Sequence, residues 1–111
     1  MNFLIESTPA FDRAIKRLLK KYHRIKFDLV ALITLLTENP YAGTAIPGYA
    51  HEVWKIRLAS TDMKVGKRSG YRVIYAIDTR RSRCYLLYIY AKTDRTNITP
   101  AEIEALLAEL E

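Results

Sequence analysis

The spacing of hydrophobic residues changes period along this chain. Near both ends apolar residues recur every three or four positions, as in amphipathic helices, whereas between residues 51 and 92 they alternate or form short runs, as in strands. The pattern predicts a short strand at Asn2–Ser7, two helices, three strands and a last helix. The order β-α-α-β-β-β-α predicts an α+β fold, with the helix pair on one face of a twisted, mainly antiparallel four-stranded sheet and the last helix beyond the final strand.

The first helix has a well-marked start. Thr8 offers a hydroxyl cap, and Pro9 takes the first helical position, where its missing N–H costs nothing. The apolar stripe that follows is Phe11, Ala14, Ile15, Leu18, Leu19 and Tyr22. The opposite face is cationic and carries Arg13, Lys16, Arg17, Lys20 and Lys21. Such a face is either an ordinary solvated helix surface or a contact site for phosphate or a protein partner.

A second helix is predicted over residues 25–38. Its buried stripe should consist of Ile25, Leu29, Leu32, Ile33 and Leu36. Asn39-Pro40 ends the helix, because proline disfavours the helical conformation in the residue before it. The glycine- and proline-containing stretch from residue 41 to residue 50 reads as a loop.

Three strands are predicted, at residues 51–59, 70–78 and 83–92. Cationic side chains gather on the first two. In the first strand Lys55 and Arg57 alternate with Trp54, Ile56 and Leu58 and therefore share the opposite face. The second strand places Arg72 among apolar residues. The loop between them adds Lys64, Lys67 and Arg68. A half-buried strand rarely needs several cations on one face, so this cluster points to a function, unless Arg72 simply pairs with Asp62 or Asp78.

The last helix carries several start signals. Thr99 can cap it, Pro100 takes the first position, Glu102 completes a capping box, and Ile98 and Ile103 have the spacing of a hydrophobic staple. Its end is acidic, with Glu104, Glu109 and Glu111. Because acid near a helix C-terminus opposes the helix dipole, we expect the last turn to be frayed or to contact basic groups.

Charge is unevenly distributed along the 111 residues. Of the net charge of +6, residues 1–50 contribute +3, residues 51–95 contribute +7 and residues 96–111 contribute −4. A basic middle segment favours a polyanionic partner such as nucleic acid. Cys84, the one cysteine, lies mid-strand and should act as a small buried apolar residue. The chain shows neither a signal peptide nor a membrane-spanning run, so a cytoplasmic protein is expected.

Four segments occur in a characteristic order: W-K-I-R-L, G-K-R-S-G-Y-R-V-I-Y, Y-L-L-Y-I-Y-A-K and N-I-T-P-A-E-I. Together they resemble the RelE/ParE toxin superfamily, and most closely its RelE/HigB-like branch of type II toxin–antitoxin systems, over about residues 39–110. The resemblance implies one toxin domain over residues 1–111. It also implies an endoribonuclease that cleaves messenger RNA in the ribosomal A site and is neutralised by a cognate acidic antitoxin.

The resemblance also implies a set of site residues. Four match catalytic positions of the family: Lys55 and Arg57 in its strand motif, Arg72 at the scissile phosphate, and Lys92 at the end of the last strand. The RNA-binding candidates are Lys64, Lys67, Arg68, Tyr71, Tyr90 and Arg95. Thr93 stands where some members have an arginine, and Thr99 where they have a base-stacking tyrosine. Stacking then falls to Tyr71, Tyr90 or Trp54, or is absent.

The chemistry expected of this set is metal-independent attack of a ribose 2′-OH on the adjacent phosphate. Arginine suits the developing charge, because its planar fork can hold two phosphate oxygens, whereas lysine acts as a point charge or a base. No metal or other cofactor is implied: the Cys and His residues lack metal-ligand spacing, and no G-x-x-x-x-G-K-[ST] loop is present. His23 and His51 both lie outside the cluster.

Two other functions remain open. A ParE-like inhibitor would hold DNA gyrase without cutting RNA, and it would share the fold, so the fold cannot separate the two. The cation cluster of Lys55, Arg57 and Arg72 favours phosphate chemistry, which a gyrase inhibitor does not require. The remaining possibility is an RNA-binding domain or an inactive relative without catalysis.

Overall fold

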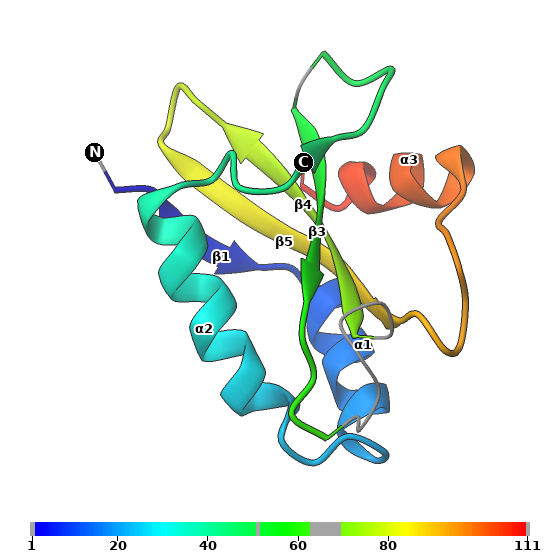
Figure 1. The fold of residues 1–111 in the computed structure, drawn as a ribbon. Helices are drawn as coiled ribbons and strands as arrows, with labels where there is room; N and C mark the ends of the chain where they lie inside the picture. The colour runs from blue at the N-terminus through cyan, green and yellow to red at the C-terminus, as the bar shows by residue number, and fades with distance from the viewer. Residues whose placement is uncertain (1, 51, 63–69, 111) are drawn as a thin grey trace.

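The structure is a computed structural model that describes residues 2–50, 52–62 and 70–110. Its elements follow the predicted order with one addition (Figure 1): β1 (Leu4–Ser7), α1 (Pro9–Leu19), α2 (Ile25–Glu38), β2 (Thr44–Ala45), β3 (Val53–Leu58), β4 (Tyr71–Asp78), β5 (Arg83–Ala91) and α3 (Pro100–Ala108). The α+β prediction is confirmed. The added strand, β2, lies in the predicted loop and is too short to show a hydrophobic period.

The described strands form a five-stranded sheet in the order β1-β5-β4-β3-β2. β1 pairs with β5 in parallel, and the other neighbours are antiparallel. β4 is therefore the central strand, with a neighbour on each side, and its residues 71–77 are all buried. Arg72, the charged residue among these seven, therefore lies inside the protein.

The two faces of the sheet carry separate apolar clusters. On one face Ile56, Val73 and Tyr75 pack with residues of α1 and α2. On the other, Val53 and Ile74 pack with Ile103 of α3 and its neighbours. Figure 1 shows α2 and α3 on opposite sides of the sheet. The alternation predicted for residues 53–58 is thus confirmed, and it assigns Lys55 and Arg57 to the α3 face.

The helix boundaries agree with the sequence signals. The Thr8 side chain accepts a hydrogen bond from the backbone N–H of Phe11, and α2 has the predicted limits. One member of the predicted α2 stripe is wrong, because Ile33 is 39% exposed. It lies on the flank of the helix, and the buried line runs through Ile25, Leu32 and Leu36 instead.

The acidic end of α3 has basic and polar contacts. The capping box of Thr99 and Glu102 is formed at its start. At its end, the Glu109 carboxylate accepts hydrogen bonds from the Arg13 guanidinium at 3.1 Å and from the backbone N–H of Ala10 at 3.3 Å. The expectation that this turn would contact basic groups is confirmed, and the contact ties α3 to the start of α1.

Cys84 is fully buried, and burial raises the pKa of its thiol to about 12. This confirms its role as a small apolar residue. His23 is exposed, whereas His51 lies outside the described residues. Over the part of the chain that the structure describes, no helix is both long and apolar enough to cross a membrane.

Candidate functional site

Three polar side chains line up on the α3 face near one end of the sheet. In the β3–β4 register Arg57 is directly opposite Arg72, and in the β4–β5 register Arg72 is directly opposite Tyr90. Opposed residues of antiparallel strands project to the same side of a sheet. We call Arg57, Arg72 and Tyr90 the central row, because its middle member lies on the central strand β4. Lys55 lies on the same face, opposite Ile74.

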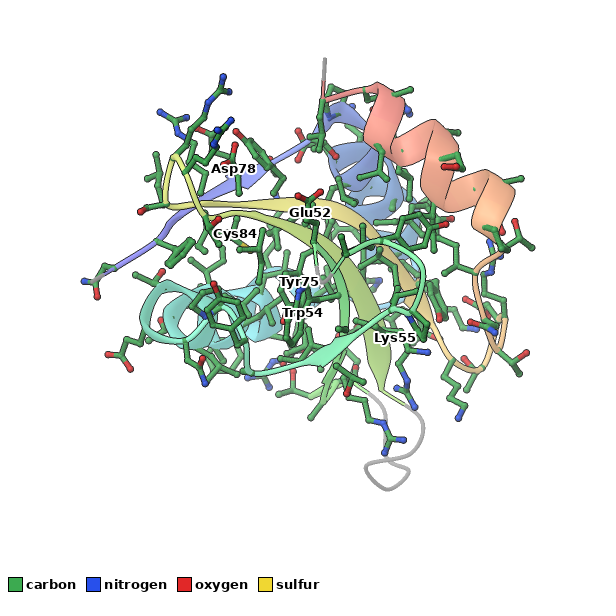
Figure 2. The ribbon with its side chains drawn as sticks, turned by 90° about the horizontal axis from the view of Figure 1, so that it is seen from above. Glu52, Trp54, Lys55, Tyr75, Asp78 and Cys84 are labelled. Carbon is green, nitrogen blue, oxygen red and sulfur yellow. The ribbon has the colours of Figure 1, made fainter. Side chains whose placement is uncertain are left out.

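Packing of the intervening residues puts the β3 cations on this face. Ile56 and Leu58 are buried in the cluster under α1 and α2, and Trp54 packs against the same cluster. Because strand side chains alternate, Lys55 and Arg57 must point the other way. Figure 2 shows Lys55 on the side of β3 away from Trp54 and Tyr75.

Arg72 is the buried cation of the row. It is 5% exposed, and its Nη1 donates to the Tyr71 carbonyl at 3.2 Å. Burial lowers the pKa of its guanidinium, and the nearby Arg57 charge lowers it further. Like charges directly opposite each other on a sheet are unfavourable. The two arginines therefore make this part of the face favourable for an anion that both can contact.

The two acids that the sequence offers to Arg72 have other partners. Asp62 accepts a hydrogen bond from the backbone N–H of Arg24 at 2.7 Å. Asp78 forms an ion pair with Arg81 at 3.8 Å. Each of these acids therefore has a contact of its own with a residue other than Arg72.

Tyr90 completes the row from β5. It is 3% exposed, and its hydroxyl is buried with no hydrogen-bond partner among the described residues. The guanidinium carbon of Arg95 lies 5.5 Å from the centre of its ring. The ring is therefore covered, which leaves little room for a base to stack on it.

Arg95 is held by an acid. Its two terminal nitrogens donate to the two Glu102 carboxylate oxygens at 2.8 and 2.6 Å, and its Nε donates to the Asn97 carbonyl at 2.8 Å. This bidentate pair offsets the charge of the predicted RNA-binding Arg95 and joins the segment after β5 to α3. The sequence shows Glu102 only as a capping residue, because the spacing of Arg95 and Glu102 across a turn is not a recognised signal.

The same pair predicts a pH effect on stability. The Arg95 guanidinium, together with the N–H of Thr99, lowers the pKa of Glu102 to about 2, below the usual value of about 4.5. A carboxylate with a lowered pKa stabilises the fold above its usual pKa, and this stabilisation is lost as the pH falls from about 4.5 to about 2. Glu102→Gln should therefore lower the melting temperature at pH 7 by more than at pH 2.5. Thermal melts of both proteins across that range test this, and an equal loss at both pH values would contradict it.

Tyr71 lies away from the central row. It is fully buried on the α1–α2 face, its ring meets that of Tyr22 edge-on at 5.6 Å, and its hydroxyl accepts from Ser60 at 3.1 Å. Trp54 faces the same side and packs against Tyr41 and Tyr75. The structure does not bring either ring together with the cations, so neither lies where the stacking hypothesis needs it.

Lys92 directly follows β5. Its backbone N–H donates to the carbonyl of Gly70, which places it beside the start of β4, and its side chain is half-buried. The structure brings it to the same end of the sheet as Arg72 and Arg57. The predicted RNA-binding residues Lys64, Lys67 and Arg68 lie outside the described residues.

A cavity of about 630 Å³ opens beside Lys55, between the 44–49 segment and the start of α3. Asn97 and Glu104 supply further polar groups to its lining. A larger cavity, of about 840 Å³, lies at the other end of β4 near Asp78 and Arg80 and is lined by none of the predicted site residues. Among the described residues, no group of three or more His, Cys, Asp or Glu side chains could hold a metal ion.

No protein-family model matches the chain. A solved structure of a mutant of the E. coli toxin RelE in the free state is 19% identical, with a TM-score of 0.57 over 98% of this chain and 94% of that chain. A crystal structure of the isolated E. coli RelE toxin is 17% identical, with a TM-score of 0.56 over 96% of this chain and 97% of that one. These structures show that the chain has the RelE fold.

Proposed function

We propose that this protein is the toxin of a type II toxin–antitoxin system, of the RelE/HigB-like kind, and a ribosome-dependent endoribonuclease. The observation that carries the proposal is the placement of Arg57 directly opposite Arg72, which is buried on the central strand. Two opposed guanidinium groups favour a bound phosphate. The likeness to E. coli RelE toxin structures supports the toxin part of the proposal.

The proposed reaction needs no metal. A ribose 2′-OH gives up its proton and attacks the adjacent phosphate, the bond from phosphorus to the 5′ oxygen breaks, and the 5′ oxygen takes up a proton, which leaves a 2′,3′-cyclic phosphate. Negative charge builds up on the phosphate oxygens during the transfer. Arg57 and Arg72 would stabilise that charge through a pre-formed pair of donors. Lys55 and Lys92 border the row and add positive charge at the sugar oxygens on either side. The cavity beside Lys55 offers space for a nucleotide next to the scissile bond.

A ParE-like gyrase inhibitor is the second candidate, because it would have the same fold. The central row argues against it. Binding a folded protein does not require two arginines in direct opposition, one of them almost completely buried, whereas such a pair suits the negative charge that develops on a phosphate. We also propose that the protein acts in the cytoplasm, because its proposed target is the ribosome. Residues 1–111 would act as one toxin domain.

The outer side of α2 supports a protein partner. Phe27 and Val30 are large apolar side chains that are 62% and 63% exposed, one turn apart on α2, and neighbouring exposed apolar groups often mark an interaction surface. Cations lie beside them: Arg24 sits over the Phe27 ring at 5.1 Å, and Lys26 is exposed one turn before Val30. An apolar strip with basic neighbours fits a partner segment with apolar and acidic side chains. We assign this strip to the cognate antitoxin.

Primer extension on a translated message tests the proposed activity. In a purified translation system, added protein should produce new 5′ ends within the coding region, and these should vanish when translation is omitted. Metal independence needs a separate comparison. Ribosomes themselves need Mg²⁺, so the metal cannot be chelated in this assay. Cleavage of ribosome-bound message is instead compared at several Mg²⁺ concentrations that keep ribosomes intact. An intact message together with loss of gyrase-dependent supercoiling would instead establish the gyrase inhibitor.

A further inference from the structure

The Tyr90 hydroxyl is an unexplained polar group in the middle of the candidate site. Buried polar groups in folded proteins are almost always hydrogen-bonded, because burying one without a partner is costly. Tyr90 is 3% exposed, and its hydroxyl lacks a partner among the described residues. A phenylalanine would fill the same space without that cost. The unpaired hydroxyl therefore indicates that a ligand binds to it.

The surroundings of the hydroxyl indicate the charge of that ligand. Tyr90 is directly opposite Arg72, which is directly opposite Arg57. An anion that relieves the repulsion between the two arginines would lie beside the third position of the row. A hydroxyl there completes a set of donors that comes from three adjacent strands. Sheet strands are rigid supports, so the backbone positions of these three residues are fixed relative to one another.

We propose that the Tyr90 hydroxyl is a hydrogen-bond donor to the phosphate that Arg57 and Arg72 bind. The inference rests on the proposed function for the identity of that phosphate as the scissile phosphodiester of RNA. It replaces the stacking role that the sequence suggested for Tyr90, since the Arg95 guanidinium covers the ring.

The protonation state of Tyr90 supports a donor and not a base. Burial raises the pKa of its hydroxyl above the usual value of 10.0, although the charges of Arg72 and Arg95 act in the opposite direction. The hydroxyl therefore keeps its proton at neutral pH. A protonated phenol can donate to a phosphate oxygen, and this contact strengthens as negative charge develops there.

Tyr90→Phe tests the proposal, because it removes one oxygen and keeps the ring. Cleavage of ribosome-bound message should fall about tenfold or more, as expected for the loss of a hydrogen bond to a charged group. The melting temperature without phosphate should stay the same or rise, since an unpaired buried hydroxyl is removed. Inorganic phosphate should raise the melting temperature of the wild type and raise that of Tyr90→Phe less.

Tyr75→Phe is the matched control. Its hydroxyl donates to the Pro40 carbonyl at 2.8 Å and accepts from the Gly43 N–H at 3.1 Å, on the opposite face of the sheet. Removing it should lower the melting temperature while cleavage per folded molecule and the phosphate response stay unchanged. This contrast separates a hydroxyl kept for a ligand from one kept for stability.

Three results would overturn the role of Tyr90: full cleavage by Tyr90→Phe, a loss of stability like that of Tyr75→Phe, or an unchanged phosphate response. Failure of the proposed function looks different. A wild-type protein that leaves every message intact would refute the nuclease, whereas the phosphate response of the two variants would still decide whether Tyr90 belongs to an anion site.

Discussion

Replacing Arg72 with alanine should abolish growth arrest and lower message cleavage by about 10²–10³-fold. The guanidinium lies on the central strand, opposite Arg57, where it would hold the phosphate in the transition state. Arg72→Lys should restore only part of the activity, because an ammonium group cannot donate in a bidentate fork. Primer extension with equal amounts of folded protein measures both variants.

Stability is the necessary control for this prediction. Arg72 is buried, so its loss leaves space and removes the Nη1 bond to the Tyr71 carbonyl, but it also removes the repulsion from Arg57. These effects oppose each other, and we expect the melting temperature to change by less than about 5 °C. Full toxicity of Arg72→Ala, or a loss of toxicity that merely follows unfolding, would refute the catalytic assignment.

The second large effect concerns the apolar strip on α2 that we propose binds the antitoxin. Val30→Glu should weaken antitoxin binding by a factor of about 30 or more, because it puts a charge in the centre of an apolar contact and repels an acidic partner. Val30 is 63% exposed and lies across the sheet from the central row, so folding and message cleavage should be unchanged. Titration of the cognate antitoxin against each protein measures the change.

Ala101→Glu controls for the added negative charge. Ala101 is exposed on α3, which packs on the opposite face of the sheet from α2. This variant should bind the antitoxin almost as the wild type does. If both variants bind equally well, the α2 strip is not the contact. Together with Arg72→Ala, Val30→Glu would separate the two surfaces: one variant loses cleavage and keeps the antitoxin, while the other does the reverse.

Much of the fold could be read from residues that are close together in the chain. The Thr8 cap, the limits of α2 and the capping box of α3 each depend on contacts within one or two helical turns, so a short segment contains all the information. The same holds for the two faces of β3, because alternation needs only one strand. β2 escaped prediction because two residues carry no period.

The candidate site was only partly accessible in this way. The sequence by itself determined which residue types stand on which strand face, and so identified Lys55, Arg57 and Arg72 as cations that needed an explanation. Strand register came only from the tertiary structure, and it set Arg57 opposite Arg72 and Arg72 opposite Tyr90. Register depends on how neighbouring strands pack against each other and on the turns that join them, and the alternation within one strand does not give it.

Tertiary packing also determined the contacts of three predicted RNA-binding side chains. Tyr71 is buried on the face that α1 and α2 cover, and Arg95 forms an ion pair with Glu102. The Tyr90 hydroxyl is buried without a partner among the described residues. A tyrosine or an arginine in a sequence indicates what it can bind. Whether it is free to do so depends on which groups the rest of the chain brings within hydrogen-bond distance.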